Sequence, residues 1–359
     1  MSESKIYRVD AAAITDWAQA CARHAGASAQ VAAHIARYLV AGDLLGFRTH
    51  GLLRLRYNLT CLDNGQSKAA GEPLVLNQRS AVQLWDADLL PGLYTMPKAI
   101  EAAIVMAKQC GTGTVVMRRT QHVAALAVYL EQATDAGMLV QLMAATPAQR
   151  AVAPFGAKSA WFSPNPLAIG VPTTGAPVLF DISLSMTAAG KVRTAIAEQR
   201  QLPYAALITA AGDYTCDPNT FLADPPSVLA PLGGEQLGYK GTGLNLFSEF
   251  WTLALSQYGR HQASGDGDAN TVWVQVIDPE AFGEGDEFRR QSQAIVTGML
   301  ETQAIDPAKP VRVPGSGALA ARQRQLEQGV EYTAAVWRQL QWCAEHCQQP
   351  LPEPRVTPE

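Results

Sequence analysis

Apolar residues near the start of the chain recur at helical spacing in two alanine-rich segments, 10–26 and 28–46. Each segment opens with a residue suited to capping a helix N-terminus and closes on a glycine, which is typical of amphipathic helices. A third helix is predicted to open at or just after Thr49 and to run to the turn at 63–65. The chain therefore begins with three predicted helices.

The middle of the chain alternates between strand and helix patterns. The predicted elements are a strand over 81–86, a helix over 96–110, a strand over 114–117, a helix over 123–136, and strands over 138–144 and 272–277. Prolines and glycines divide residues 147–177 into short pieces. Such alternation is typical of α/β proteins, here with some α+β character.

A charged helical pattern follows Pro314 and continues to about Cys347. We expect this tail to pack back on the N-terminal helices, because neither end alone has much apolar surface to bury against. With 359 residues, of which 48% are hydrophobic, the chain is long enough for two or three lobes. The predicted division is an N-terminal helical domain over 1–75, a central domain over 76–310 and a C-terminal helical segment over 311–359.

Charge and cysteine usage exclude several classes of protein. The 28 Lys and Arg and 32 Asp and Glu residues give a net charge of -4 with no basic stripe, so no nucleic-acid partner is expected. The polar first ten residues and the lack of any apolar run of about 18 residues predict a cytoplasmic protein with no membrane contact. The six cysteines are scattered and expected to be reduced, and no metal site is expected because the cluster of Cys343, His346 and Cys347 lacks a fourth ligand.

The glycine-rich turn of a Rossmann dinucleotide-binding fold is absent. No predicted strand is followed by Gly-x-Gly-x-x-Gly, and Gly238, Gly241 and Gly243 have a different spacing. Gly190-Lys191 lacks the flanking residues of a Walker loop. A nucleotide site in this chain must therefore be built in another way.

His50 and Arg54 form the first candidate site. If the third helix has begun by His50, the two side chains lie one turn apart on one face. Reducing a carbonyl beside a carboxylate needs a proton donor, which histidine supplies, and a cation for the carboxylate, which arginine supplies with two parallel hydrogen bonds. The alternative on spacing alone is that both residues are ordinary side chains at a loop-to-helix junction.

Three further residues are candidates by position. His122 stands between a predicted strand and the next helix, where loops often carry chemistry, or else it is a helix-start histidine bonded to backbone. Asp181 ends an apolar run and is either an orienting or ribose-binding carboxylate or a turn cap. Lys240 lies between Gly238 and Gly241 on a predicted loop that could approach a phosphate, or else it is a solvated lysine.

Taken together, the motifs resemble the type-2 malate/L-lactate/L-sulfolactate dehydrogenase family over nearly the whole chain. This family also includes ureidoglycolate dehydrogenase, 2,3-diketo-L-gulonate reductase and Δ1-piperideine-2-carboxylate reductase. The matching segments are Thr49-His50-Gly51-Leu52-Leu53-Arg54, Arg118 to His122, Pro164-Asn165-Pro166-Leu167, Asp181 to Met186 with Gly190-Lys191, Gly238 to Leu244, and Val313-Pro314-Gly315. Departures include Thr49 in place of the usual serine and Val123-Ala124 in place of Phe-Gly.

The resemblance implies a non-Rossmann NAD(P)-binding fold with a mixed sheet and flanking helices, working as a homodimer with the active site near the subunit boundary. The central domain would bind NAD or NADP, and the sequence does not decide between them. The implied catalytic residues are His50 as proton donor, Arg54, His122 and Asp181, although some members of the family use the residue matching His122 as the acid/base. Arg54, Thr49 and Arg48 would bind substrate. The implied cofactor contacts are Phe180, Asp181, Ile182, Ser183, Tyr239, Lys240, Gly315, Ser316 and Gly317.

Three functions remain open at this point. The first is an NAD(P)-dependent oxidoreductase that interconverts a small 2-oxo acid and its 2-hydroxy acid. The second is a reductase of cyclic imines such as Δ1-piperideine- or Δ1-pyrroline-2-carboxylate, which needs the same hydride, proton donor and carboxylate clamp. The third is a relative that binds nucleotide without turnover, which the altered pocket segments favour and the retention of His50, Arg54, His122, Asp181 and Lys240 opposes.

Overall fold

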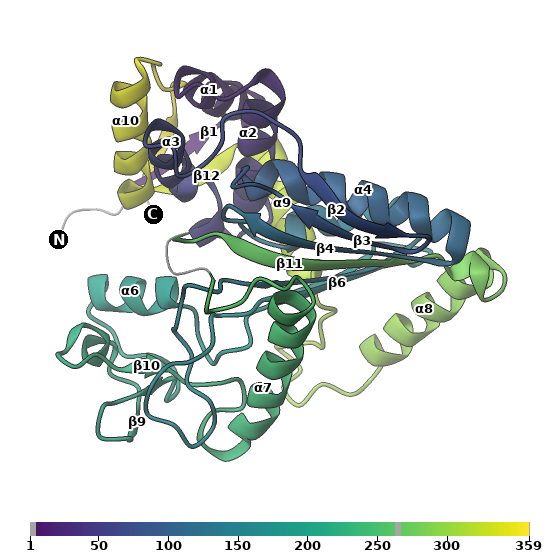
Figure 1. Ribbon diagram of the computed structural model, residues 1–359. Helices are drawn as coiled ribbons and strands as arrows, with labels where there is room; N and C mark the ends of the chain where they lie inside the picture. Colours follow the sequence, from purple (N-terminus) through teal and green to yellow (C-terminus); the bar gives the residue numbers. More distant parts are fainter. Residues whose placement is uncertain (1–4, 263–266, 359) are drawn as a thin grey trace.

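A seven-stranded mixed sheet forms the centre of the computed structural model, which describes residues 5–262 and 267–358 (Figure 1). The first four residues of the polar start lie outside this description. The strand order is β2-β3-β4-β11-β5-β6-β7, and only the β3 and β4 pair is parallel. The strands are β2 Leu74–Arg79, β3 Val82–Asp86, β4 Thr112–Thr120, β5 Leu139–Ala145, β6 Leu167–Val171, β7 Val178–Ile182 and β11 Asn270–Ile277. The mixed sheet confirms the α/β class expected from the alternating pattern.

Strand β11 is almost wholly buried because it pairs with β4 on one side and β5 on the other. Its valines at 272, 274 and 276 belong to the large core shared with the helices, whereas Trp273 points to the opposite face. Helix α4 (Gly92–Cys110) packs on the face of the sheet that carries these valines, here called the first face. A Cβ at Gly113 would collide with the Ala103 carbonyl of α4, so glycine permits this close approach of helix and strand.

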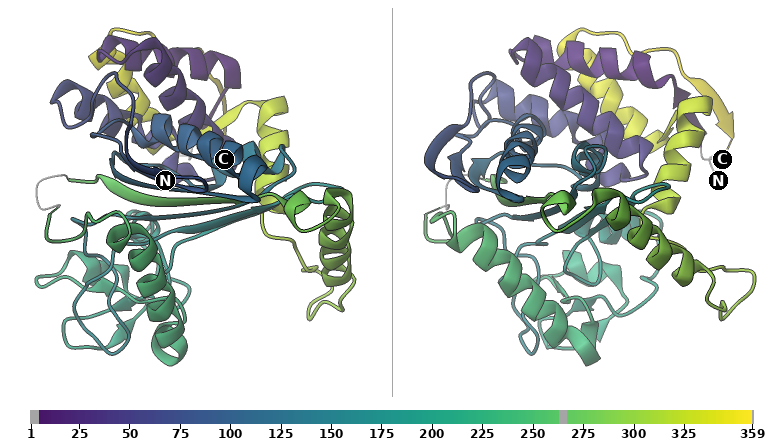
Figure 2. Two further views of the ribbon diagram at one scale, coloured as in Figure 1. Left: turned by 45° about the vertical axis from the view of Figure 1, so that its right-hand side comes forward. Right: turned by 90° about the vertical axis from the view of Figure 1, so that its right-hand side faces the viewer.

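The first face of the sheet also carries both ends of the chain. Figure 2 shows the N-terminal and C-terminal helices clustered there, away from the teal and green segments on the other face. These elements are β1 Lys5–Val9, α1 Ala11–His24, α2 Ala29–Leu44, α3 Leu55–Asp63, α5 Ala127–Thr134, α9 Ser316–Gln328, β12 Val330–Thr333, α10 Ala334–Cys347 and β13 Arg355–Pro358. Strand β1 pairs with both β12 and β13, and α10 contacts α1 and α3.

The opposite face is covered by a second layer with a small core of its own. Helix α7 and the π-helical turn after it contact β5 and β11, with Phe247 against Trp273 and Met143. Beside them, Val192 and Ala195 of α6 pack with Val152 and other residues. The layer contains α6 Ala189–Ala197, β8 Leu207–Ile208, β9 Tyr214–Thr215, a 3-10 turn Pro218–Leu222, β10 Val228–Leu229, α7 Gly234–Glu249 and the π-helix Phe250–Ala254.

Helix α8 (Gly285–Leu300), which follows a 3-10 turn at Pro279–Ala281, extends away from the rest of the molecule (Figure 2). Only Gly285 and Ser292 of this helix are buried. In the described ranges, no helix is both long and apolar enough to cross a membrane.

Three local predictions were wrong. The helical pattern from Pro314 to about Cys347 is not continuous, because α9 ends before Gly329 (φ +97°) and strand β12 separates it from α10. The segment around His50 is not a regular helix: two 3-10 turns, Arg48–His50 and Leu52–Arg54, precede α3, and Gly51 between them has an extended conformation with φ -92° and ψ -146°. Lys240 is not on a loop, because Gly238 and Gly241 lie inside α7. A Cβ at Gly241 would collide with backbone at Leu232, so this glycine serves helix packing instead of a turn.

Candidate functional site

The loop that carries His50 and Arg54 is held by a buried carboxylate. Asp43, on the last turn of α2, is 3% exposed and accepts a hydrogen bond of 2.8 Å from the Leu52 backbone N–H. A side chain at Gly51 would collide with the Asp43 carboxylate. Burial raises the pKa of Asp43 to about 7, and the hydrogen bond from Leu52 opposes that rise. The Gly51 backbone and Asp43 thus fix the direction in which both turns project their side chains.

His50 and His122 meet across the site although they lie 72 positions apart in the sequence. Their rings are stacked with centroids 5.7 Å apart and planes 8° apart. The Nδ1 of His50 lies 2.9 Å from the Thr49 hydroxyl oxygen. The Nδ1 of His122 accepts a hydrogen bond of 3.2 Å from the Ala124 N–H, so the neutral ring of His122 carries its proton on Nε2. The loop after β4 therefore presents His122 as a hydrogen-bond donor.

Burial and Arg54 control the protonation of the two histidines. Burial lowers the pKa of His50 to about 4, and the neighbouring Arg54 guanidinium adds to the effect. The pKa of His122 is also lowered, first by burial and then by the charges of Arg54 and His50. Both rings are therefore neutral at pH 7. The Nε of Arg54 donates to the Thr49 carbonyl at 3.2 Å, which leaves the outer nitrogens of the guanidinium for an anion.

Asp181 holds the loop of His122 through the backbone. Its Oδ2 accepts a hydrogen bond of 2.9 Å from the N–H of Ala127, the first residue of α5. Burial raises the pKa of Asp181 to about 6, and the N–H groups of Ala127 and Leu126 counter that rise. The carboxylate thus serves as a cap at a helix start and connects the edge strand β7 to the segment that follows His122.

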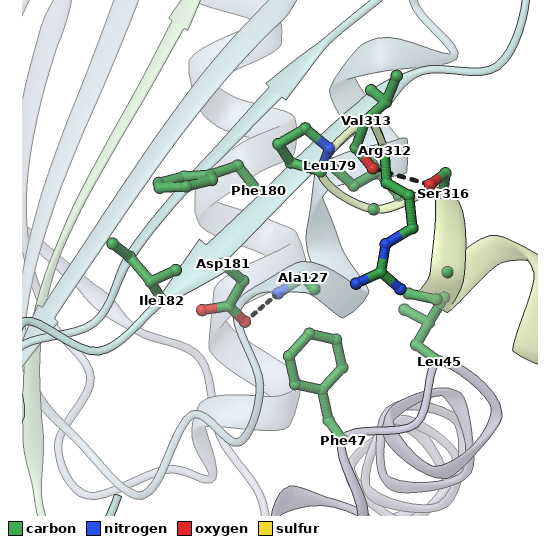
Figure 3. Close-up of a pocket in the computed structure, with 14 residues that line it drawn as sticks. Leu45, Phe47, Ala127, Leu179, Phe180, Asp181, Ile182, Arg312, Val313 and Ser316 are labelled. Carbon is green, nitrogen blue, oxygen red and sulfur yellow. Dashed lines mark hydrogen bonds between the residues drawn. The ribbon is translucent and has the colours of Figure 1, made fainter. Parts of the chain in front are cut away.

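Beside the histidine pair, and lined in part by Asp181, lies a cavity of about 610 Å³ (Figure 3). Its wall combines β7, the start of α9 and the segment before Arg48. The lining residues are Leu45, Phe47, Ala127, Leu179, Phe180, Asp181, Ile182, Arg312, Val313, Pro314, Gly315, Ser316, Gly317 and Ala318. The start of α9 packs closely against β7 because residue 315 is a glycine. A Cβ at Gly315 would lie 2.6 Å from the Leu179 carbonyl oxygen, and its φ of +89° also favours glycine.

The cavity gathers six of the nine residues expected to contact a cofactor. The six are Phe180, Asp181, Ile182, Gly315, Ser316 and Gly317. The other three do not line it: Tyr239 and Lys240 are exposed on α7, and the Ser183 hydroxyl accepts a hydrogen bond from Ser185 at 3.2 Å. These six residues come from two distant segments of the chain that meet at one cavity.

The expected substrate residues differ in their availability. Thr49 and Arg54 lie at the histidine pair, as described above. Arg48 instead forms a 3.2 Å ion pair with Glu331 on β12, and Arg8 binds the same carboxylate at 3.0 Å. In this structure Arg48 therefore stabilises the contact between the N-terminal and C-terminal segments.

Three residues that no sequence motif singled out also approach the site. Tyr57 stands edge-on to His122, with ring centroids 6.1 Å apart. Asp268, which is hydrogen-bonded to Gln149, interacts with Tyr57 and Arg54, and Arg193 on α6 lies close enough to repel Arg54. None of the three stands in a recognisable motif, and the fold alone brings them together.

The contact between α6 and Thr49 explains the position of Arg193. A Cβ at Gly190 would lie 3.0 Å from the Thr49 Cγ2, so the first turn of α6 packs on the loop of His50. Arg193 is three residues later, on the same face of the helix. Val192 and Ala195 point into the small core of the second layer. The site therefore lies between the N-terminal helices and the second layer.

Known proteins of similar sequence include named dehydrogenases and reductases. The chain is 28% identical to the L-lactate dehydrogenase of Cupriavidus necator over 324 residues, which covers 88% of this chain and 91% of that protein. It is also 28% identical to a Δ1-pyrroline-2-carboxylate/Δ1-piperideine-2-carboxylate reductase of Pseudomonas putida, over 92% of this chain and 95% of the relative. Homologues of both reaction types thus align over most of their length.

Solved structures share the whole fold. The malate dehydrogenase of Entamoeba histolytica superposes with a TM-score of 0.91 at 22% identity, covering 97% of this chain and 99% of that one. This match confirms the expected non-Rossmann arrangement of a mixed sheet with flanking helices. The sequence profile of the malate/L-lactate dehydrogenase family matches residues 9–341. The resemblance seen in the motifs is thereby confirmed, and the chain belongs to the malate/L-lactate dehydrogenase family.

Proposed function

We propose that this protein is an NAD(P)-dependent oxidoreductase that interconverts a small 2-oxo acid and the corresponding 2-hydroxy acid. The observation that carries the proposal is the stacked pair of His50 and His122 beside Arg54, near a cavity of about 610 Å³. Family membership and the named dehydrogenases among its relatives support it. The pair supplies proton transfer, and Arg54 supplies a carboxylate clamp.

The residues of the cavity fit a dinucleotide. Phe180 and Ile182 offer apolar surface, Ser316 and the backbone of Gly315 and Gly317 offer polar groups, and Arg312 offers a cation. A bound nicotinamide would supply or accept the hydride at C2 of the substrate. We place Ser183, Tyr239 and Lys240 among the cofactor contacts as well, as the family motifs predict, although their side chains lie outside this cavity.

We assign His50 as the principal acid/base. In the oxidation of a 2-hydroxy acid, neutral His50 accepts the hydroxyl proton while the hydride leaves C2. In the reverse reaction, protonated His50 returns a proton to the carbonyl oxygen as the hydride arrives. Burial is the main cause of the low pKa of His50, and the Arg54 charge adds to it. A substrate carboxylate at Arg54 offsets that second contribution, so substrate binding favours proton uptake. His122 donates from Nε2 and orients the same oxygen.

Reduction of a cyclic imine is the second candidate. Asp268 interacts with Arg54 and Tyr57, so the site contains a carboxylate as well as cations. A carboxylate stabilises a protonated imine, whereas a neutral carbonyl group gains nothing from it. The Pseudomonas putida relative is named for this reaction.

We further propose that the protein is a cytoplasmic homodimer. Helix α7, the π-helical turn and the residue after it expose several large apolar side chains that a second copy would cover. They are Leu237, Leu244, Leu246, Phe250, Trp251 and Leu255. Sedimentation of the purified protein tests this: a monomer at micromolar concentration would contradict it.

The experiment that tests the reaction follows NADH and NADPH oxidation with pyruvate, oxaloacetate, 2,3-diketogulonate and the two cyclic imines, between about pH 6 and 8. Turnover of an oxo acid supports the main proposal, and turnover of the imines alone supports the second. Nucleotide binding with no oxidation on any substrate would favour the non-catalytic alternative.

A further inference from the structure

Arg312 supplies the cation that the cavity offers to a dinucleotide. Among the described residues that line the cavity, Arg312 alone is basic. It lies four residues before the start of α9, and Figure 3 shows its guanidinium directed into the cavity on the side of Leu45 and Phe47. The side chain is exposed to solvent and thus open to a ligand.

Arg312 has no ion pair or hydrogen bond within the part of the chain that the structure describes. Arg322 of α9, by contrast, is paired with Glu131. An arginine with five donors that points into a cavity without a protein acceptor offers two parallel hydrogen bonds to a phosphate or carboxylate. The anion that completes its bonding must therefore come from a ligand or from solvent.

The carboxylate in the cavity lining already accepts a hydrogen bond from the protein. Asp181 is the one carboxylate among the described lining residues, and its Oδ2 accepts the Ala127 N–H at 2.9 Å. In Rossmann folds a carboxylate binds the ribose 2′-hydroxyl of NAD, whereas an arginine accommodates the 2′-phosphate of NADP, and this charge complementarity does not depend on the fold. In this cavity the Asp181 carboxylate already accepts a helix-start N–H, whereas the Arg312 guanidinium has no partner among the described residues. The charge left for a ligand is therefore positive, which fits the second pattern.

We propose that Arg312 binds the 2′-phosphate of the cofactor and that the enzyme prefers NADPH to NADH. The inference rests on the proposed cofactor site. Arg312 is exposed and makes no ion pair or hydrogen bond with the described residues, so the Arg312→Gln protein is expected to fold normally.

Equilibrium binding tests the inference without any substrate. Quenching or enhancement of nicotinamide fluorescence yields Kd values for NADPH and NADH with the wild-type protein, with Arg312→Gln and with Arg324→Gln. Arg324, on the exposed part of α9 outside the cavity, is the matched control. We expect wild-type protein to bind NADPH more tightly. Arg312→Gln should weaken NADPH by about 10- to 100-fold, the range for losing hydrogen bonds to a charged group, and change NADH by less than about twofold.

The other outcomes separate the two proposals. Equal weakening of NADPH and NADH by Arg312→Gln would mean that Arg312 contacts the pyrophosphate, which overturns the assignment. Tighter binding of NADH than NADPH by wild-type protein overturns the NADPH preference and leaves the proposed reaction standing. If neither nucleotide binds the wild-type protein, the proposed function fails together with this inference.

Discussion

The loop of His50 and the cavity beside α9 lie next to each other, but different kinds of chemical group form them. Around His50 the protein brings together partly buried titratable side chains whose pKa values are shifted by burial and by one another. Around Gly315 it presents backbone, apolar surface, the Asp181 carboxylate and one exposed arginine, and no histidine stands among the described lining residues. The first arrangement is suited to moving a proton and the second to holding a ligand. Substitutions in the two regions should therefore affect turnover and affinity separately.

Loss of the His50 ring should produce the largest effect. We expect His50→Ala to lower turnover by roughly 10² to 10⁴, the range for removing a positioned acid/base, with little change in the Kd for the nucleotide. Steady-state kinetics and fluorescence titration measure the two quantities. If a well-folded His50→Ala protein retains full turnover, the assignment passes to His122.

Replacement of Arg54 comes next. Arg54→Gln should raise the KM for carboxylate substrates by about 10- to 100-fold, because a charged hydrogen-bond donor to the substrate is lost. It should also raise the pKa of His50, since the repelling guanidinium is gone. Titration of the His50 ring by NMR measures that shift. A KM unchanged for every oxo acid would remove Arg54 from the substrate site.

A side chain at Gly51 should displace the His50 loop from its contact with Asp43. Gly51→Ala drives a methyl group into the Asp43 carboxylate, and we expect a loss of about 1–3 kcal/mol in stability with a fall in turnover. The matched control is Gly298→Ala on α8, where a Cβ meets nothing within 4 Å. Thermal unfolding compares the two variants, and equal melting temperatures would show that Asp43 does not confine the loop.

Substitutions of Asp43 itself test its hydrogen bond to the loop. Asp43→Ala removes the acceptor of the Leu52 N–H and should cost about 1–3 kcal/mol, whereas Asp43→Asn retains an oxygen in the same place and should cost less. A positioning role also requires that Asp43→Ala lower turnover and Asp43→Asn largely restore it. Identical kinetics for both variants and the wild type would argue against that role.

The pH dependence should show the smallest but most diagnostic effect. Since the pKa of His50 is lowered to about 4 from an ordinary 6.5, the proton-accepting form persists as pH falls through 6 and is lost only near 4. The kcat/KM for oxidation of a 2-hydroxy acid reports the free enzyme. It should show no histidine inflection near 6.5. Because Asp181 has a pKa of about 6, an Asp181→Asn control identifies any inflection that belongs to that carboxylate.

Sequence patterns located the parts of the fold whose periodicity is strong. The two long N-terminal helices and the apolar strand at 272–277 were predicted close to their observed bounds. Lys240 was misplaced because glycines at 238 and 241 suggested a loop, whereas both glycines permit α7 to pack closely on Pro231 and Leu232. A glycine in a sequence does not reveal whether a turn or a neighbour requires it.

The residues of the site also fall into those that sequence motifs mark and those that only the fold brings together. Residues in motifs, such as His50 and Arg54, could be predicted because neighbours along the chain mark them. Asp43 and Arg312 could not, since their roles depend on a loop nine residues away and on a strand from another part of the chain. The charge state of His50 was also beyond the sequence, because burial and the approach of Arg54 set it.

The most direct test of this division is a single-turnover measurement of hydride transfer with nucleotide already bound. Wild-type protein and His50→Ala would be saturated with NADPH, as followed by fluorescence, and then mixed with the 2-oxo acid found active in the substrate panel. We expect both proteins to bind nucleotide equally and hydride transfer in His50→Ala to be slower by about 10² or more. Equal rates of hydride transfer in the two proteins, or loss of nucleotide binding in His50→Ala, would contradict the separation of proton transfer from cofactor binding.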